Sequence, residues 1–282
     1  MTIATICVCG AGTMGSGIAQ VAATAGFHVI VFDVNANTLE HSRQMIDKQL
    51  QQLVVKNKLT AEEARSTLLR IRWVQDINDC IADLIIEAII EKEAAKVALF
   101  NQLAEVNHSE TIFATNTSSL SVRSIAEKVI QPGRVVGMHF FNPAPLMKLV
   151  EVVSTPHTMP EVTESIEAVA HQMGKVTVRC IDAPGFIVNH VARPYYLEAL
   201  RLMEQGVATP ETIDTVMEAS GFKMGPFKLM DLIGNDINYA VSCSVYEQLG
   251  QPERLKPSAI QQEKVQSGKL GRKSGEGYYR YQ

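Results

Sequence analysis

Short apolar runs alternate with longer segments of mixed polarity along the first two thirds of the chain. The runs at 3–9 and 28–33 enclose a stretch of helical pattern at 16–25, and together they predict a β-α-β unit. Similar runs follow, separated by segments long enough for helices. This alternation is typical of a parallel sheet with helices on both faces, because such strands are buried on both sides. The later runs lie at 83–90, 111–116 and 134–141.

The segment between Asn37 and Arg72 interrupts this alternation. It is charged and rich in glutamine, and Thr60 is followed three positions later by Glu63, which is the capping-box pattern of a helix start. We therefore predict two helices here rather than a strand, inserted after the second strand of the sheet.

The pattern changes near residue 184. Before it, a helical pattern stops at Gly174 and a strand pattern covers 176–180. After it, apolar residues recur at helical spacing without a strand pattern, and Thr209 followed by Pro210 favours a helix start. We therefore predict a sheet domain followed by a smaller all-α domain. The predicted domains are 1–184 and 185–282.

Charge and composition narrow the classes of function. The chain carries 26 Lys and Arg against 30 Asp and Glu, a formal net charge of −4, without a long basic run, so we expect no nucleic-acid partner. No apolar stretch reaches the roughly 18 residues of a membrane span. The N-terminus enters an apolar run without a basic leader, so we expect a cytoplasmic protein that makes no membrane contact.

The five cysteines are scattered and odd in number, which predicts reduced thiols rather than a disulfide framework. Cys7 and Cys9 are close in sequence, but no second pair of ligands follows them. We therefore predict buried strand positions and no metal site.

The sequence GAGTMG follows the first strand pattern and opens the first helix pattern. In a dinucleotide-binding turn, Gly10 permits the tight turn, Gly12 lets the backbone approach a pyrophosphate, and Gly15 lets helix and strand pack closely. The N-terminus of the following helix supplies amide donors and partial positive charge to the phosphates, and Thr13 and Met14 are also predicted cofactor contacts. A glycine turn without a ligand is the alternative, and the strand-helix-strand context favours the dinucleotide.

Asp33 ends the second predicted strand, eighteen residues after Gly15. A carboxylate there bonds the adenosine ribose hydroxyls and repels a 2′-phosphate, so the predicted cofactor is NAD rather than NADP. The predicted fold class is therefore α/β, with a Rossmann-type doubly wound sheet, an inserted helix pair and a helical C-terminal domain.

His139 lies in an apolar run, where a histidine is ordinarily a packed core residue. A nicotinamide cofactor changes this expectation, because oxidation of an alcohol requires a base for the hydroxyl proton. The runs RVVGMHFF and LMKLVEVV are joined by Asn142-Pro143-Ala144-Pro145, and residue 145 is midway between His139 and Glu151. If the runs pair, His139 and Glu151 face each other, and the carboxylate orients the imidazole. An ordinary edge-strand charge is the alternative for Glu151.

Several segments carry a resemblance to a known family. In chain order they are GAGTMGSGIAQVAA, EAIIEKEAAK, TNTSSLS, HFFNPAPLMKLVEVV, DAPGFIVNH and GRKSGEGYY. In order and spacing they resemble the L-3-hydroxyacyl-CoA dehydrogenase family, and most of all its compact bacterial 3-hydroxybutyryl-CoA dehydrogenases. The resemblance implies reversible oxidation of the (S)-3-hydroxyl group of a short-chain acyl-CoA to a ketone, with NAD as hydride acceptor. Fatty-acid and butanoate metabolism both use this reaction.

The resemblance also implies roles for individual residues. His139 matches the catalytic acid/base and Glu151 its partner, while Ser118 and Asn189 match polar residues beside the reacting oxygens of the substrate. Further positions match contacts to the cofactor, and Lys56 matches a basic contact to CoA, although Gln49 replaces a small hydroxyl residue of related sequences. The implied cofactor contacts are Glu91, Lys96, Asn116, Ser118, Asn142 and Lys273.

The helical C-terminal domain resembles the region of the family that forms the dimer and the acyl pocket. The resemblance covers Met224 to Phe227 and the apolar face through Leu229, Leu232 and Ile233. We therefore expect a homodimer, with simple core packing as the alternative.

Two other classes of function stay open. A related sequence type is a structural protein of the lens, which would make this chain a non-catalytic member. A wider group of dehydrogenases acts on free 3-hydroxy acids, but that group uses a catalytic lysine where this chain offers His139 and Glu151.

Overall fold

The computed structural model describes residues 2–281 and divides into two compact units between Asp182 and Ala183. The first unit holds the sheet and the second is helical. This arrangement confirms the predicted fold class. Within the described residues, no helix combines the length and the apolar character needed to cross a bilayer.

An eight-stranded sheet forms the centre of the first unit. Its strands are β1 (Thr5–Cys9), β2 (His28–Phe32), β3 (Ile71–Val74), β4 (Leu84–Glu87), β5 (Ile112–Thr115), β6 (Val135–Phe140), β7 (Leu149–Ser154) and β8 (Val176–Ile181). They lie in the order β3-β2-β1-β4-β5-β6-β7-β8. Neighbouring strands are parallel except β6 and β7, which are antiparallel. The carboxyl ends of β1, β4, β5 and β6 therefore lie along one edge of the sheet.

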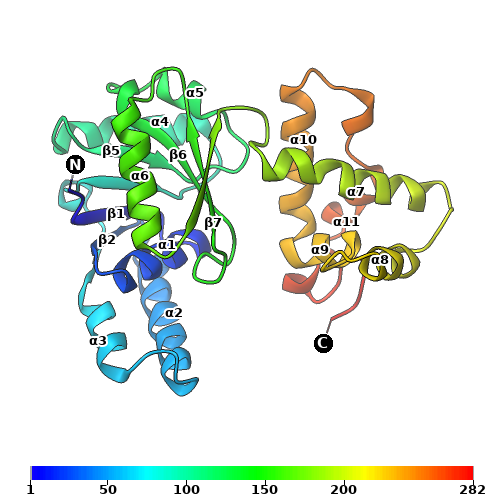
Figure 1. Ribbon diagram of the computed structural model, residues 1–282, viewed down its shortest axis with the longest axis horizontal. Helices are drawn as coiled ribbons and strands as arrows, with labels where there is room; N and C mark the ends of the chain where they lie inside the picture. Colours follow the sequence, from blue (N-terminus) through cyan, green and yellow to red (C-terminus); the bar gives the residue numbers. More distant parts are fainter. Residues whose placement is uncertain (1, 282) are drawn as a thin grey trace. The chain divides into compact units, whose positions relative to one another are not determined.

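Helices cover the sheet and extend beyond it. Figure 1 shows α6 lying across one face of the sheet, while α2 and α3 extend away from it. Apolar residues of α1 and α6 belong to one core with those of β1, β2 and β4. The helical elements of this unit are α1 (Thr13–Thr24), α2 (Ala36–Val55), η1 (Ile77–Asp79), α3 (Ala61–Leu69), α4 (Glu93–Val106), α5 (Val122–Ala126), η2 (Pro132–Arg134) and α6 (Pro160–Gln172).

The two helices predicted between residues 37 and 72 are present as α2 and α3, and Thr60 and Glu63 form the predicted capping box. The strand β3, which begins at Ile71 at the end of this segment and pairs with β2, was not predicted. Only Ile71 and Val74 of its four residues are buried. An edge strand of four residues that includes an exposed arginine has too little alternation to be recognised from sequence.

The first helix was predicted from residue 16 but begins at Thr13. Its N-cap residue is Gly12, which has no side chain to form a capping hydrogen bond. The usual signal of a helix start, a Ser, Thr, Asp or Asn at the N-cap, is therefore missing from the sequence.

The second unit has an apolar core of its own, built from residues of α7, α8, α9 and α10. That core includes Tyr196, Leu200, Phe227, Met230 and Val245. The predicted helix start is present, since the Thr209 side chain accepts a hydrogen bond from the amide of Thr212. The helical elements are α7 (Val188–Glu204), α8 (Pro210–Ala219), α9 (Pro226–Ile233), α10 (Asn235–Gln248), η3 (Glu253–Leu255), α11 (Ala259–Gln266) and η4 (Arg272–Ser274).

We predict that Gly15→Ala destabilises the protein, although alanine is normally the better helix residue. A Cβ atom at residue 15 would lie 1.7 Å from the carbonyl oxygen of Gly10, so helix and strand would have to separate. The expected loss in the free energy of unfolding is about 2 kcal/mol, measured by urea denaturation. Gly12→Ala is the matched control, because nothing lies within 4 Å of its added Cβ. Equal losses for the two variants would contradict this account of the packing.

Candidate active site

The loops that follow β1, β4, β5 and β6 meet at the carboxyl edge of the sheet. The order of the strands reverses between β1 and β4, since β2 and β3 continue on one side of β1 and β4 and β5 on the other. In open α/β sheets, ligands bind at such a reversal. Apart from Lys56, and Glu151 on β7, every predicted site residue of the first unit lies on or shortly after these strands, after β2, or at the start of α1 or α4.

The glycine loop has the backbone that a dinucleotide requires. Gly10 adopts φ +99°, and an added Cβ there would lie 2.5 Å from the carbonyl oxygen of Ala88. The space in front of Gly12 is open, and no side chain within the described residues caps the start of α1 at Thr13 and Met14. The backbone therefore fits close approach of a phosphate to an exposed helix N-terminus. Phosphate binding by these residues stays a prediction.

Asp33 holds its carboxylate beside this loop. Its Oδ2 accepts a hydrogen bond of 2.9 Å from the amide of Ala11, and its Oδ1 accepts one of 2.9 Å from the amide of Asn35. These contacts place an acceptor next to the glycine turn, as ribose recognition requires.

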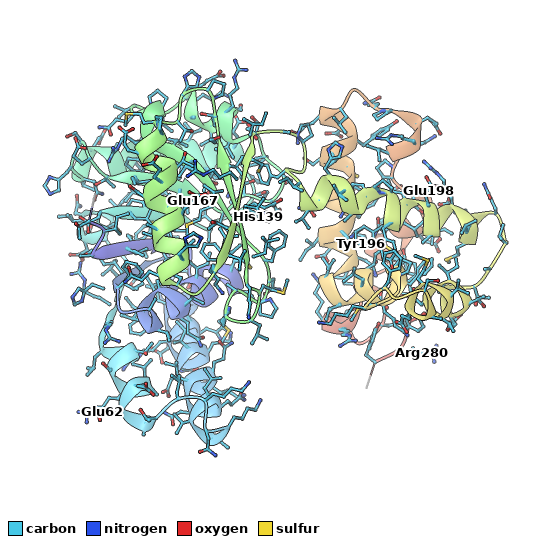
Figure 2. The ribbon with its side chains drawn as sticks, viewed as in Figure 1. Glu62, His139, Glu167, Tyr196, Glu198 and Arg280 are labelled. Atoms are coloured by element: carbon cyan, nitrogen blue, oxygen red, sulfur yellow. The ribbon has the colours of Figure 1, made fainter. Side chains whose placement is uncertain are left out.

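The predicted contact between His139 and Glu151 is present. The two residues are direct partners across the antiparallel pair β6 and β7, and Nδ1 of His139 lies 2.7 Å from Oε2 of Glu151. The side chains are 6 % and 1 % exposed, and Figure 2 shows His139 on this strand pair. When Nδ1–H of the neutral ring donates a hydrogen bond to Glu151, Nε2 carries the lone pair and can accept a proton. The pair can therefore act as an oriented base.

A buried lysine stabilises the turn between these two strands. Nζ of Lys175 donates to the carbonyl oxygens of Ala144 and Met147, at 2.5 and 2.8 Å. Asn142, a predicted cofactor contact, is exposed in the same turn. Sequence analysis did not identify Lys175, because it lies between a helix and a strand outside any motif.

Two buried side chains, Glu87 and Lys96, form a charged cluster with the partly exposed Glu91 after β4. Nζ of Lys96 lies 2.6 Å from Oε1 of Glu87 and 3.1 Å from Oε2 of Glu91. Lys96 is 1 % exposed, so in this structure its ammonium contacts carboxylates rather than solvent. Lys96 as a contact to the cofactor stays a prediction. Glu87 was not predicted, because its position inside an apolar strand gave no sign of a charged partner.

The two carboxyl groups of this cluster have opposite pKa shifts. Burial raises the pKa of Glu87 above its usual value, although Lys96 and Thr115 favour its ionised form. Burial alone would also raise the pKa of Glu91, but attraction to Lys96 and a hydrogen bond from Thr117 hold it below the usual value. Glu87 accepts hydrogen bonds from Lys96, Ile89 and Thr115, a set of three donors that suits an ionised carboxylate.

Glu91 holds the segment that carries Ser118. Its Oε1 accepts hydrogen bonds from Oγ1 of Thr117 at 2.5 Å and from the amide of Ser118 at 3.0 Å. Oδ1 of Asn116 accepts a 2.8 Å hydrogen bond from the amide of Phe140, next to His139. The structure therefore brings the predicted residues Glu91, Asn116 and Ser118 together at one edge of the sheet.

Three predicted residues come from other elements of the chain. Asn189 is in the first turn of α7 and Lys273 pairs with Asp236 at 2.6 Å, both in the second unit. Lys56 is exposed at the C-terminal end of α2. Their predicted contacts to substrate and cofactor stay predictions. Among residues 2–281, no group of three His, Cys, Asp or Glu side chains is arranged to hold a metal ion.

Comparison with known proteins gives matches for both units. Residues 5–183 match the family described as "3-hydroxyacyl-CoA dehydrogenase, NAD binding domain", and residues 185–281 match "3-hydroxyacyl-CoA dehydrogenase, C-terminal domain". The chain is 50 % identical over 281 residues to "3-hydroxyadipyl-CoA dehydrogenase" of Escherichia coli (strain K12), which covers 99 % of this chain and 59 % of that protein. It therefore spans about three fifths of that relative's length.

Two further relatives match over their full length. The chain is 42 % identical to "Probable 3-hydroxybutyryl-CoA dehydrogenase" of Bacillus subtilis (strain 168), covering 100 % of this chain and 99 % of the relative. The crystal structure of (S)-3-hydroxybutyryl-CoA dehydrogenase from Ralstonia eutropha superposes with a TM-score of 0.94 at 35 % identity, covering 100 % of both chains.

We predict that Lys96→Met destabilises the protein more at pH 7.5 than at pH 5. Without Lys96 the folded pKa of buried Glu87 rises further above its unfolded value of about 4.3, so stability falls as the pH rises through the folded pKa. Glu91 loses its stabilising partner as well, a loss that is partly screened because its side chain is 38 % exposed. We expect Lys96→Met to lower the free energy of unfolding by about 3 kcal/mol at pH 7.5. At pH 5 the loss should be smaller than this by at least about 1 kcal/mol.

Lys175→Met is the matched control for this measurement. Lys175 is also buried, but it donates to backbone carbonyl oxygens, so its removal leaves no buried carboxylate behind. Its loss of stability should be the same at both pH values in urea denaturation. If the loss of stability of Lys96→Met were also the same at both pH values, this would contradict an ionised Glu87.

Proposed function

We propose, because the chain belongs to the 3-hydroxyacyl-CoA dehydrogenase family, that it oxidises the (S)-3-hydroxyl group of a short-chain acyl-CoA to a ketone, and also catalyses the reverse reaction. Residues 5–183 are the NAD-binding domain of this family of oxidoreductases, and NAD is the cofactor. The observation that carries the proposal is the buried pair His139 and Glu151, at the sheet edge that also holds the glycine loop.

In the proposed reaction His139 is the base. Nε2 accepts the proton of the substrate hydroxyl as the C3–O bond becomes a carbonyl, and in the reverse direction it returns that proton. NAD, when bound, accepts the hydride that leaves C3. The charge that develops on the imidazole is stabilised by Glu151, which is buried and lies 2.7 Å from Nδ1. A carboxylate in a buried setting has a stronger effect on a neighbouring charge than one in water.

We assign Ser118 and Asn189 to the substrate oxygens, and Glu91 and Asn116 to contacts with the cofactor. Asn142 is assigned to the side of the site that receives the nicotinamide. A hydroxyl group and an amide can donate hydrogen bonds where negative charge develops on oxygen. Glu91 accepts hydrogen bonds from the amides of Ser118 and Ser119, which supports a role in fixing that segment. Lys56 and Lys273 are proposed contacts to CoA and to the cofactor.

Two acyl groups are candidates for the natural substrate. Sequence resemblance favours 3-hydroxybutyryl-CoA, the substrate in the names of the Bacillus subtilis and Ralstonia eutropha relatives. The Escherichia coli relative, named for 3-hydroxyadipyl-CoA, favours a six-carbon dicarboxylic acyl group at 50 % identity. Both substrates present the same C3 hydroxyl to His139.

We also propose a homodimer built on the helical unit. Of the residues in the predicted interface, Phe227 is fully buried in the core of its own unit, whereas Leu232 is 48 % exposed. Val216 and Phe222, on and after α8, are 57 % and 50 % exposed. Exposed apolar side chains on or next to α8 and α9, two helices that contact each other, favour an interface over core packing alone.

The proposed function requires the CoA ester. We expect NADH oxidation with acetoacetyl-CoA and a rate at least about 10²-fold lower with free acetoacetate, because the CoA portion supplies binding energy for positioning. The measurement is the loss of NADH absorbance with each substrate. Equal rates would favour the dehydrogenases of free 3-hydroxy acids, and no rate with either would favour a non-catalytic member.

His139→Ala should lower kcat by at least about 10²-fold and leave NADH affinity nearly unchanged, because the base is removed without altering the glycine loop. Steady-state kinetics and NADH fluorescence titration measure the two effects. His157→Ala is the control, since His157 is a partly exposed histidine whose ring nitrogen lies 3.5 Å from Glu127, outside the proposed site. A His139→Ala enzyme with most of its turnover would exclude His139 as the base.

A further inference from the structure

Helix α7 carries a buried arginine that no carboxylate neutralises. Arg193 is 2 % exposed and lies one helical turn after Asn189. Within residues 2–281 it forms no ion pair with an Asp or Glu, and burial lowers its pKa to about 10. A buried guanidinium is ordinarily paired with a carboxylate, because moving an unpaired charge out of water is unfavourable. The absence of such a partner therefore calls for an explanation.

Neutral groups orient the guanidinium without balancing its charge. Nε donates to the carbonyl oxygen of Asn189 at 3.0 Å, and Nη1 donates to the carbonyl oxygen of Asn238 at 2.9 Å and to Oγ of Ser242 at 2.8 Å. The ring of Tyr196, labelled on α7 in Figure 2, lies 4.8 Å from the guanidinium carbon. The fork is therefore fixed in direction between α7 and α10 while it keeps a full positive charge.

Two neighbouring donors have no acceptor among the described residues. Nη2 of Arg193 makes no hydrogen bond there, yet it is not one of the fully buried polar atoms that lack a partner, so it reaches solvent-accessible space. Nδ2 of Asn238 is buried and lacks a partner, and Oδ1 of the same residue accepts from Gln261 at 3.0 Å, which fixes the orientation of the amide. An anion at Nη2 would accept a hydrogen bond from a charged donor.

We propose that Arg193 binds the distal carboxylate of a dicarboxylic acyl-CoA, and so makes the six-carbon diacid the preferred substrate. This inference rests on the proposed function, in which Asn189 lies beside the oxygen on C3. Three C–C bonds of about 1.5 Å separate C3 from the terminal carboxyl carbon of a six-carbon chain. Residues four apart on a helix share a face and are separated by about 6 Å along its axis. The chain from C3 to the terminal carboxyl group, with the hydrogen bonds at its two ends, can span this separation.

A shorter or uncharged acyl chain leaves the positive charge of Arg193 without a negative partner. A four-carbon substrate ends one carbon beyond C3, and a six-carbon monoacid brings a methyl group instead of a carboxylate. A site that holds a buried polar group rejects an analogue that cannot pair with it. Neutral acceptors already bind part of the guanidinium, so the preference should be smaller than the largest values seen for such sites. We expect kcat/KM for the dicarboxylic substrate to exceed that for an uncharged one by about 10- to 10²-fold.

The first experiment uses the wild-type chain and measures kcat/KM for NADH oxidation with three substrates. We expect 3-oxoadipyl-CoA to exceed 3-oxohexanoyl-CoA, which has the same length without the carboxylate, by at least about 10-fold. Acetoacetyl-CoA is the third substrate. Equal values for the two six-carbon substrates would overturn the inference while leaving the proposed function intact, whereas no activity with any CoA ester would count against the proposed function itself.

The second experiment assigns the preference to Arg193. Arg193→Met should lower kcat/KM for 3-oxoadipyl-CoA by about 10²-fold and change the value for acetoacetyl-CoA by less than about 3-fold. Arg193→Lys, which keeps the charge but not the fork, should fall between wild type and Arg193→Met. Arg201→Met is the matched control on the same helix, because Arg201 donates to the carbonyl oxygens of Glu253 and Arg254 in a structural contact.

A structural role for Arg193 predicts a different pattern. If Arg193 only joins α7 to α10, Arg193→Met will lower kcat/KM for all substrates by one factor, as expected for Arg201→Met, and the inference is overturned. If Arg193→Met does not fold, the comparison of the two six-carbon substrates in the wild type still decides whether a carboxylate is recognised.

Discussion

A hydrogen bond of 2.7 Å joins Nδ1 of His139 to Oε2 of Glu151 across the only antiparallel pair of the eight-stranded sheet that the structure describes. The reversal of direction between β6 and β7 lets residues twelve positions apart become direct partners, which a parallel neighbour joined by a crossover helix would not allow. Both side chains are buried, so neither can exchange its partner for water without loss of stability. This contact depends on the register of β7 and on the turn between the two strands, which the hydrogen bonds from Lys175 stabilise.

Buried charges are concentrated near the residues that we assign to the reaction. In the first unit, Lys96 is enclosed by Glu87 and Glu91, and Glu91 in turn fixes the amide of Ser118. In the second unit, Arg193 is buried beside Asn189 with neutral partners only. The first cluster carries more acid than base, and the arginine carries an unbalanced positive charge. Replacing buried ion pairs with apolar residues is often neutral or stabilising, so stability alone does not explain either arrangement.

Much of the fold could be predicted from sequence because two local signals coincide with global features. The alternation of apolar runs and helix-length segments gave the doubly wound sheet, and GAGTMG gave the turn that Gly10 and Gly15 form. The strand at Ile71 was missed because a four-residue edge strand buries too few side chains to leave a pattern. The burial of Lys96 and Arg193 could not be predicted, since a charged residue in a helix is normally solvated and only tertiary packing encloses it.

A double-mutant cycle on kcat tests most directly whether Glu151 acts through His139. The cycle compares wild type, Glu151→Gln, His139→Ala and the double variant, with 3-hydroxybutyryl-CoA and NAD. Our account predicts that Glu151→Gln lowers kcat by about 10-fold or more when His139 is present, and by less than about 2-fold when it is absent. The same loss in both backgrounds would contradict it, because Glu151 would then act on the reaction without the imidazole.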